Sequence, residues 1–264
     1  VGCVIVFEDN IIGEGYHAIY GGPHAEVNTI QQVKDKQLLS KSTLYVNLEP
    51  CNHFGKTPPC SHLIVDMKIP HVVIGQLDPF EKVNGTGLEY LRSMGVSIIH
   101  GILENECRLL NKRFNTFQEK KRPYVVLKWA QSQDVYIDPL RENNVQGSIA
   151  ISGLESRKRV HEWRAQEMGI VVGRKTIEVD NPQLNVRLAA GDHPIRIIID
   201  PDLKSLSNSQ AHILDGAIPT LIFHCSDIHS PLFDNVTCIQ VERSSLWPQL
   251  LASLHEKGIT SILV

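Results

Sequence analysis

The chain has 264 residues, of which 42% are hydrophobic and 21% charged, and its formal net charge is −3. This length allows one large domain or two modest ones, and the composition excludes a disordered chain, a collagen and a coiled coil. The net charge also argues against a general nucleic-acid binder, and the sequence contains no apolar run long enough for a transmembrane helix.

The first 118 residues are predicted to alternate strands and helices. A turn at Asp9-Asn10 between two apolar runs indicates a hairpin. Predicted strands cover 1–7, 11–16, 43–48, 71–75 and 96–100, and predicted helices cover 24–33, 60–67, 87–94 and 104–117. This order predicts an α/β domain with a mixed or parallel sheet and helices on its faces.

A second α/β unit is predicted over residues 124–264, after a charged, proline-terminated linker at 119–123. Ser152 and Glu155 have the spacing of a capping box at the start of its first helix. Predicted strands cover 124–129, 169–172, 195–199, 220–224, 238–241 and 259–264, and predicted helices cover 152–165 and 246–257.

Six cysteines in a chain of this length do not form the dense framework of a small secreted domain. Because no signal peptide is recognisable either, we expect a reducing, cytoplasmic location. Both ends of the sequence lie within apolar, strand-like runs, so we expect the chain to be a fragment truncated at both ends.

The most informative residues are His24, Glu26, Cys51 and Cys60. One His and two Cys thiolates provide the three protein ligands that a catalytic zinc site needs, and helix N-termini favour the thiolate form. Glu26 follows His24 by two residues, so its carboxylate lies near the metal without binding it. His-x-Glu followed by Pro-Cys and a second Cys is typical of zinc deaminases, in which zinc activates water and the Glu transfers protons.

Each of these residues also has a simpler interpretation. His24 could be a core histidine, and Cys51 and Cys60 could be buried thiols. A closed structural zinc site would need a fourth ligand, for which His53 and His62 are candidates. The combination of the three ligands with Glu26 and both Pro-Cys pairs favours the deaminase interpretation.

Eight residues separate Cys51 from Cys60, whereas the cytidine, tRNA and polynucleotide deaminase pattern has two. With this loop, the sequence resembles the bacterial bifunctional riboflavin-biosynthesis deaminase/reductase family along essentially its whole length. The matching runs of the first 115 residues are VGCVIV at 1–6, GGPHAEVN at 21–28, LYVNLEPCNHFGKTPPC at 44–60, Asp78-Pro79 and Leu110-Asn111-Lys112.

The resemblance implies a cytidine-deaminase-like three-layer α/β/α domain over 1–118. It implies that His24, Cys51 and Cys60 bind zinc and that Glu26 carries protons. His53 and Lys56 match substrate contacts of the family. A flexible lysine cation suits a phosphorylated, oxygen-rich pyrimidine.

Residues 122–264 by themselves indicate only an α/β domain, because they lack the Gly-x-Gly-x-x-Gly fingerprint of dinucleotide-binding domains. The run Gly173-Arg174-Lys175-Thr176 is a weak indication of a phosphate-binding loop, and a plain turn explains it as well. The resemblance implies an NADPH-dependent reductase domain with an incomplete dihydrofolate-reductase-like fold.

The motifs of that reductase domain occur here in the family's order. They imply that Lys128, Thr176 and Asp180 contact the cofactor. They also imply that the substrate is bound by four residues, which are Ser148, Arg164, Leu184 and Arg187. Two arginines in one pocket suit a ribose phosphate, which guanidinium groups can hold bidentately.

The sequence departs from the family pattern at several points. Val135 stands where the family has Gly, which predicts a changed turn because Gly tolerates a positive φ angle and Val does not. Ala150 stands where the family has Trp or a similar residue. The family's Glu-Gly-Gly segment is expected beyond Val264, and its Asn-Pro segment before Val1.

The resemblance therefore implies an enzyme of riboflavin biosynthesis that deaminates a small phosphorylated pyrimidine with zinc and then reduces its ribosyl group with NADPH. We expect a homo-oligomer and neither nucleic-acid nor membrane partners. Two alternatives are a deaminase with a degenerate reductase-like domain, and a non-enzymatic zinc-binding module.

Overall fold

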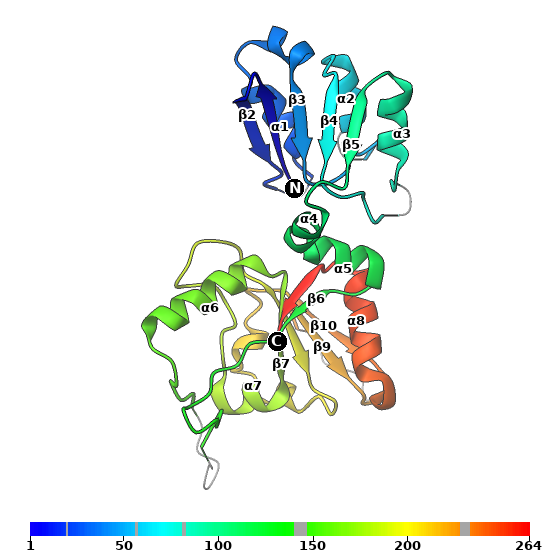
Figure 1. Ribbon diagram of the computed structural model, residues 1–264. Coiled ribbons are helices and arrows are strands. Elements are labelled where there is room, and N and C mark those ends of the chain that lie inside the picture. The colour runs from blue at the N-terminus through cyan, green and yellow to red at the C-terminus, as the bar shows by residue number, and fades with distance from the viewer. Residues whose placement is uncertain (20, 56–57, 81–82, 140–146, 228–232) are drawn as a thin grey trace. The chain divides into compact units, whose positions relative to one another are not determined.

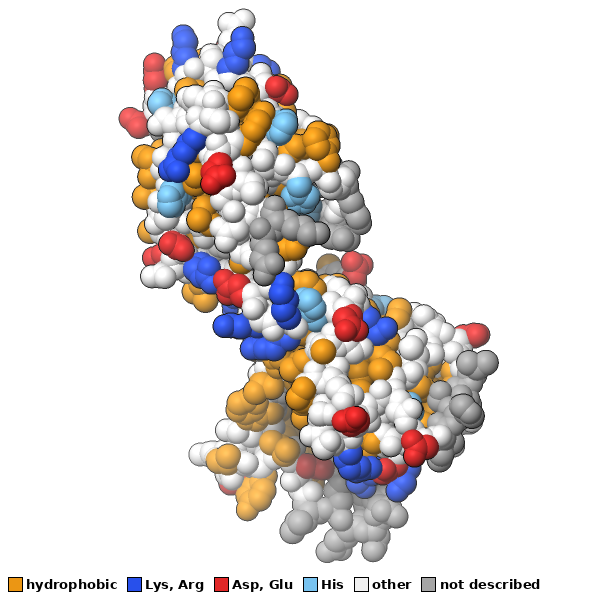
Figure 2. All heavy atoms as spheres, turned by 90° about the vertical axis from the view of Figure 1, so that its right-hand side faces the viewer, with side chains coloured by type: hydrophobic (Ala, Val, Ile, Leu, Met, Phe, Trp, Pro, Cys, Tyr) orange, Lys and Arg blue, Asp and Glu red, His pale blue; other side chains and the backbone are white. Residues whose placement is uncertain are grey.

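The structure, a computed structural model, describes residues 1–264 except 20, 56–57, 81–82, 140–146 and 228–232. The chain forms two compact units, Val1–Glu119 and Lys120–Val264. On the face drawn in Figure 2, acidic and basic side chains are interspersed on each unit, in keeping with a net charge of only −3.

The first unit contains a five-stranded mixed sheet with the strand order β2-β1-β3-β4-β5 (Figure 1). The edge strand β2 (Asn10–Tyr16) and the third strand β3 (Thr43–Val46) both pair antiparallel with β1 (Gly2–Phe7). From β3 onwards the pairing is parallel, through β4 (His71–Ile74) to β5 (Ser97–His100).

Three helices pack with this sheet in a single hydrophobic core: α1 (Ala25–Gln32), α2 (Cys60–Asp66) and α3 (Thr86–Ser93). Every second residue of the central strands points into that core, including Ile5 and Leu44. Since α1 and α2 both begin at the end of the sheet where β3 finishes, their first residues come together there.

On the face of the sheet opposite this core, the strand residues Val4, Tyr45 and Val73 line a cavity of about 880 Å³. Ile102 and Leu103 line the same cavity, and none of His24, Glu26, Cys51 and Cys60 does.

The single helix predicted over 104–117 is wrong, because the structure has two helices there. These are α4 (Glu104–Leu110) and α5 (Lys112–Lys120), separated at Asn111. The Asn115 amide donates to the Arg108 carbonyl and pairs reciprocally with the buried amide of Gln76, at 2.9 and 3.2 Å. A polar side chain that bonds to a freed backbone carbonyl competes with a continuous helix.

The second unit has a six-stranded, all-parallel sheet with the order β10-β9-β8-β7-β11-β6. Its strands are β6 (Tyr124–Val126), β7 (Gly169–Gly173), β8 (Ile195–Ile199), β9 (Thr220–His224), β10 (Val236–Gln240) and β11 (Ser261–Leu263). Its α-helices are α6 (Leu154–Gln166), α7 (Arg174–Asp180) and α8 (Leu246–Glu256).

A hydrophobic core lies on each face of this sheet. Ile198 and Ile222 point into the core that contains Ile177 of α7, whereas Ile197 and Phe223 point into the one that contains Leu250 of α8. Burial of both faces explains the nearly continuous apolar strands of this unit. The predicted α/β fold class is confirmed in both units.

Two further local predictions are wrong. Helix α6 begins at Leu154 with Gly153 as its N-cap, and Glu155 forms an ion pair with Lys158 at 3.0 Å instead of a capping box. Val135 has a φ of 71°, so the turn keeps the left-handed conformation that the family's Gly would adopt. The first two residues of the predicted linker, Glu119 and Lys120, belong to helix α5, and the boundary between the two units falls between them.

Candidate active sites of the two units

Three predicted zinc ligands converge in the first unit. His24 is the N-cap of α1, Cys60 is the first residue of α2, and Cys51 lies in the loop that follows β3. Nδ1 of His24 lies 3.5 Å from Sγ of Cys51 and 3.4 Å from Sγ of Cys60, and all three ligand atoms lie within 4.8 Å of one another.

This ligand set fits a zinc ion. Tetrahedral zinc with usual bond lengths separates a nitrogen ligand from a sulfur ligand by about 3.6 Å, close to the spacings found here. Among the described residues, no further His, Cys, Asp or Glu side chain joins this group. His62 stacks on Tyr90, with 4.3 Å between ring centroids. Three protein ligands with one open position are the arrangement of catalytic zinc rather than of structural zinc.

Glu26 lies in the first turn of α1 and is only 3% exposed. Burial is the largest cause that raises the pKa of its carboxyl, and the nearby Cys51 raises it further. A carboxyl group with a raised pKa can both accept and release a proton near neutral pH, as a general acid and base must.

The two thiols respond differently to their common environment. The pKa of Cys51 is lowered mainly by a hydrogen bond from the Cys60 thiol. Burial raises this pKa in part, and His24 lowers it further. The same bond and burial raise the pKa of Cys60. These contacts favour the thiolate form of Cys51, which is the form that binds a metal cation.

His17 is a residue near this site that the sequence did not indicate. Its ring meets the ring of His24 edge-on, with centroids 5.3 Å apart, and its Nδ1 donates to the Pro23 carbonyl at 3.0 Å. No spacing pattern connects His17 with the zinc ligands, since the chain returns to His24 only after the turn that follows β2.

The long loop between the two cysteines places His53 on the surface. The charge of His53 lowers the pKa of Asp78, although burial, the largest cause, raises that pKa to about 6. Lys56 lies outside the described residues.

In the second unit, three of the predicted site residues form a cationic cluster. Arg164 of α6 donates to the Asn185 carbonyl at 3.1 Å, and Arg187 donates to the Asn185 side chain at 2.9 Å. Lys128 is close enough that Arg164 lowers its pKa, after burial as the larger cause. None of these three cations forms an ion pair within the described part of the chain, and Nε of Arg164 is buried without a partner.

This cluster has the electrostatics of an anion site. Burial, followed by Arg187, lowers the pKa of Arg164. His161 beneath it is 4% exposed and accepts a bond from the Arg187 backbone, and burial and the two arginines lower its pKa to about 4. Three mutually repelling cations above a neutral histidine favour a ligand that carries negative charge.

Three other predicted residues lie on or beside α7. Thr176 lies in the first turn of α7 and Asp180 is the last residue of that helix. Gly147 donates its backbone N–H to the Val179 carbonyl at 2.8 Å, which brings the neighbouring Ser148 to the same end of α7. Helix α7 contains the run proposed as a phosphate loop, so that run is a helix start and not a plain turn.

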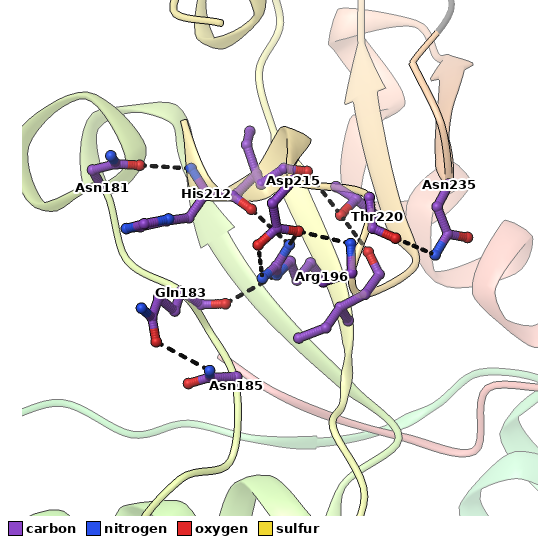
Figure 3. Close-up of polar contacts among 12 residues, drawn as sticks. Asn181, Gln183, Asn185, Arg196, His212, Asp215, Thr220 and Asn235 are labelled. Carbon is purple, nitrogen blue, oxygen red and sulfur yellow. Dashed lines mark hydrogen bonds and ion pairs between the residues drawn. The ribbon is translucent and has the colours of Figure 1, made fainter. Parts of the chain in front are cut away.

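Leu184 is 3% exposed and has a φ of 53°, and its side chain packs in the hydrophobic core. Figure 3 shows how the segment around it is held. The guanidinium of Arg196 donates to the Gln183 carbonyl at 3.0 Å and binds both carboxylate oxygens of Asp215, at 2.7 and 3.1 Å. Asn181 accepts a bond from the His212 backbone at 2.9 Å.

Comparisons with known proteins agree with this geometry. The cytidine and deoxycytidylate deaminase zinc-binding region matches residues 1–76, and the RibD C-terminal domain matches residues 123–264. The riboflavin biosynthesis protein RibD of Aquifex aeolicus is 42% identical over 77% of this chain and 56% of its own length. That of Actinobacillus pleuropneumoniae is 42% identical over 100% of this chain and 70% of its own length.

A solved structure extends the agreement to three dimensions. The diaminohydroxyphosphoribosylaminopyrimidine deaminase/5-amino-6-(5-phosphoribosylamino)uracil reductase of Thermotoga maritima superposes with a TM-score of 0.88 at 38% identity, covering 100% of this chain and 73% of that one. The chain therefore belongs to the RibD family of riboflavin biosynthesis proteins, bifunctional enzymes with a zinc-binding deaminase domain and an NADPH-dependent reductase domain.

Proposed function

We propose that the protein catalyses two consecutive steps of riboflavin biosynthesis. The first unit hydrolytically removes the 2-amino group of 2,5-diamino-6-(5-phospho-ribosylamino)pyrimidin-4-one, with water consumed and ammonia released. The second unit transfers a hydride from NADPH and reduces the ribosyl group to ribityl. The observation that carries the first step is the convergence of His24, Cys51 and Cys60 beside the buried Glu26.

In the proposed deamination, zinc held by these three ligands would supply a Lewis acid that makes water reactive near neutral pH. Glu26 accepts the proton of the attacking water and returns protons to the ring nitrogen and to the leaving ammonia. Its burial supports this role because the raised pKa keeps the protonated form accessible. His53 and Lys56 are proposed to bind the substrate. His17, whose ring meets that of His24 edge-on, is proposed to contact the substrate as well.

Glu26→Gln tests this assignment directly. We expect ammonia release to fall below detection while one zinc per chain remains bound, because the amide keeps the shape of the side chain but cannot carry the proton. Glu89→Gln, on the exposed surface of α3, is the matched control and should keep full activity. Deaminase activity retained by Glu26→Gln would refute the role of Glu26.

For the reductase step, we propose that Arg164 and Arg187 bind the substrate phosphate, with Ser148 and Leu184 contributing to the same substrate site. Lys128, Thr176 and Asp180 are proposed to contact NADPH. The unpaired cations around Asn185 support the anion site. Titration of the chain with NADPH tests the cofactor assignment, because absence of binding would favour the alternative of a deaminase with a degenerate second domain.

We further propose a cytoplasmic homo-oligomer. None of the six cysteines forms a disulfide, and their sparse number supports a reducing compartment. None of the helices in the described part of the chain has the length and hydropathy needed to cross a bilayer. Apolar side chains around α4 are well exposed, including Leu103, Leu109 and Leu110, and can form a subunit interface. The molar mass from light scattering tests the oligomeric state.

A further inference from the structure

We propose that Glu49 is a positioning residue for the zinc site, because it fixes the turn that carries Cys51 against the start of α3. This inference rests on the proposed ligand set of His24, Cys51 and Cys60. Glu49 precedes Cys51 by two residues, and its own backbone N–H donates to the Gln76 carbonyl at 3.0 Å.

The carboxylate of Glu49 is surrounded by backbone donors. Oε1 accepts from the N–H groups of Gly87 and Leu88, at 3.0 and 3.3 Å. Oε2 accepts from those of Asp78 and Gly85, at 3.2 and 3.0 Å. Glu49 is 3% exposed, and in the described part of the chain no cation pairs with it. Four N–H groups therefore replace the solvation of a buried charge, and the positive end of α3 adds to them.

The chain beyond Cys51 is attached to the same helix. Asn52 donates its amide to the Thr86 carbonyl at 3.2 Å and accepts from the Ser61 hydroxyl at 2.7 Å. Between these attachments the backbones touch, since a Cβ atom at Gly87 would lie 2.1 Å from the Pro50 carbonyl oxygen. The turn that bears Cys51 is thus held to α3 on both sides of the ligand.

The arrangement requires both oxygens of a carboxylate. In Glu49→Gln the amide nitrogen must face one of the two pairs of N–H donors, whichever way the side chain is flipped. Two hydrogen bonds are then lost and donor faces donor, so the turn shifts away from α3. Because Cys51 moves with the turn, the zinc ligands lose their preset spacing.

The test measures zinc binding by the full chain, with Glu89→Gln as the matched control on the exposed face of α3. Competition with a chromogenic chelator should show zinc affinity lowered by about 10- to 100-fold in Glu49→Gln, the usual effect of losing an outer partner of a metal site. The cobalt-substituted protein should also show a changed ligand-field spectrum, which a purely structural role would leave unchanged.

A second variant keeps the proposal testable if Glu49→Gln does not fold. Gly87→Ala keeps the glutamate, but its Cβ would lie 2.1 Å from the Pro50 carbonyl oxygen and 3.3 Å from Oε1 of Glu49. It should therefore disturb the same attachment and lower zinc affinity in the same direction. Unchanged zinc affinity and cobalt spectrum in the folded variants, with only a lower unfolding temperature, would overturn the inference. Failure of the unsubstituted chain to bind one zinc would instead overturn the ligand assignment itself.

Discussion

The two candidate sites are prepared for their ligands in opposite ways. In the first unit, a thiol pair and a histidine from two helix starts and one loop already lie within 4.8 Å of one another, and hydrogen bonds connect them. In the second unit, Arg164 lies between two other cations, Lys128 and Arg187, and keeps a buried Nε without a partner.

The charges of the two groups determine which ligand each site is suited to bind: a metal cation in the first unit and an anion in the second. In the first unit, Nδ1 of His24 contacts both sulfur atoms, so the group is held together by its own contacts. Among the described residues, no acidic side chain forms an ion pair with the cationic cluster, so an anionic ligand would compensate its charge. Zinc binding should therefore require all three ligands, whereas the affinity of the cationic site for its ligand should depend on the number of positive charges.

The largest effect should come from breaking the ligand set. Cys60→Ser should abolish stoichiometric zinc binding and lower deaminase activity by about 100-fold or more, because a hydroxyl is a far weaker zinc ligand than a thiolate. Zinc content and ammonia release measure the two effects. Cys238→Ser, in a strand of the second unit, is the control. Tight zinc binding by Cys60→Ser would contradict the assignment.

The cationic cluster should be sensitive to charge. Arg187→Gln should weaken binding of the phosphorylated substrate by about 10- to 100-fold, as expected when a hydrogen bond to a charged group is lost. Calorimetric titration at two salt concentrations measures the affinity and its dependence on charge. Arg157→Gln, exposed on α6, should have no effect. Equal losses in both variants would mean that the cluster attracts anions only nonspecifically.

The ion pair of Arg196 and Asp215 should titrate with acid. Arg196 lowers the pKa of Asp215 below its usual value of 3.8, so this pair stabilises the fold fully above that pH and stops doing so as the pH falls through the lower folded value. Asp215→Asn should cost about 2 kcal/mol at pH 7, less than for a fully buried pair because the side chain of Asp215 is 35% exposed.

Urea unfolding of the unsubstituted chain and of Asp215→Asn, at pH 7 and at pH 3, measures the loss of unfolding free energy. This loss should be smaller at the lower pH. The exposed pair of Arg243 and Asp202 provides the control, and Asp202→Asn should cost less than about 0.5 kcal/mol. A cost for Asp215→Asn that stays constant with pH would exclude the ionic contribution.

The smallest effect concerns the turn at Val135. Since Val135 holds a φ of 71° that favours Gly, Val135→Gly should stabilise the second unit by about 0.5–1 kcal/mol. Thermal unfolding measures the gain. Val135→Ala should give no comparable gain, because alanine is also strained at this φ; equal stabilisation by both variants would point to side-chain exposure instead.

The sequence alone predicted the chemistry of the zinc site because that information is local. His24 and Glu26 share one helical turn, and Cys51 and Cys60 follow a strand and begin a helix, so spacing and residue type sufficed. The α/β class followed similarly from hydrophobic alternation, and the two-faced core of the second sheet appeared as apolar runs.

Only the tertiary structure decided what depends on contacts between distant residues. The break at Asn111 follows from Asn115 meeting Gln76, and Glu49 acquired its role from N–H groups 29 to 39 residues further along the chain. The positive φ at Val135 is equally invisible in the residue type. Residue types and their spacing express local preference and chemistry, whereas a buried hydrogen bond forms only where the whole fold brings its donor and acceptor together.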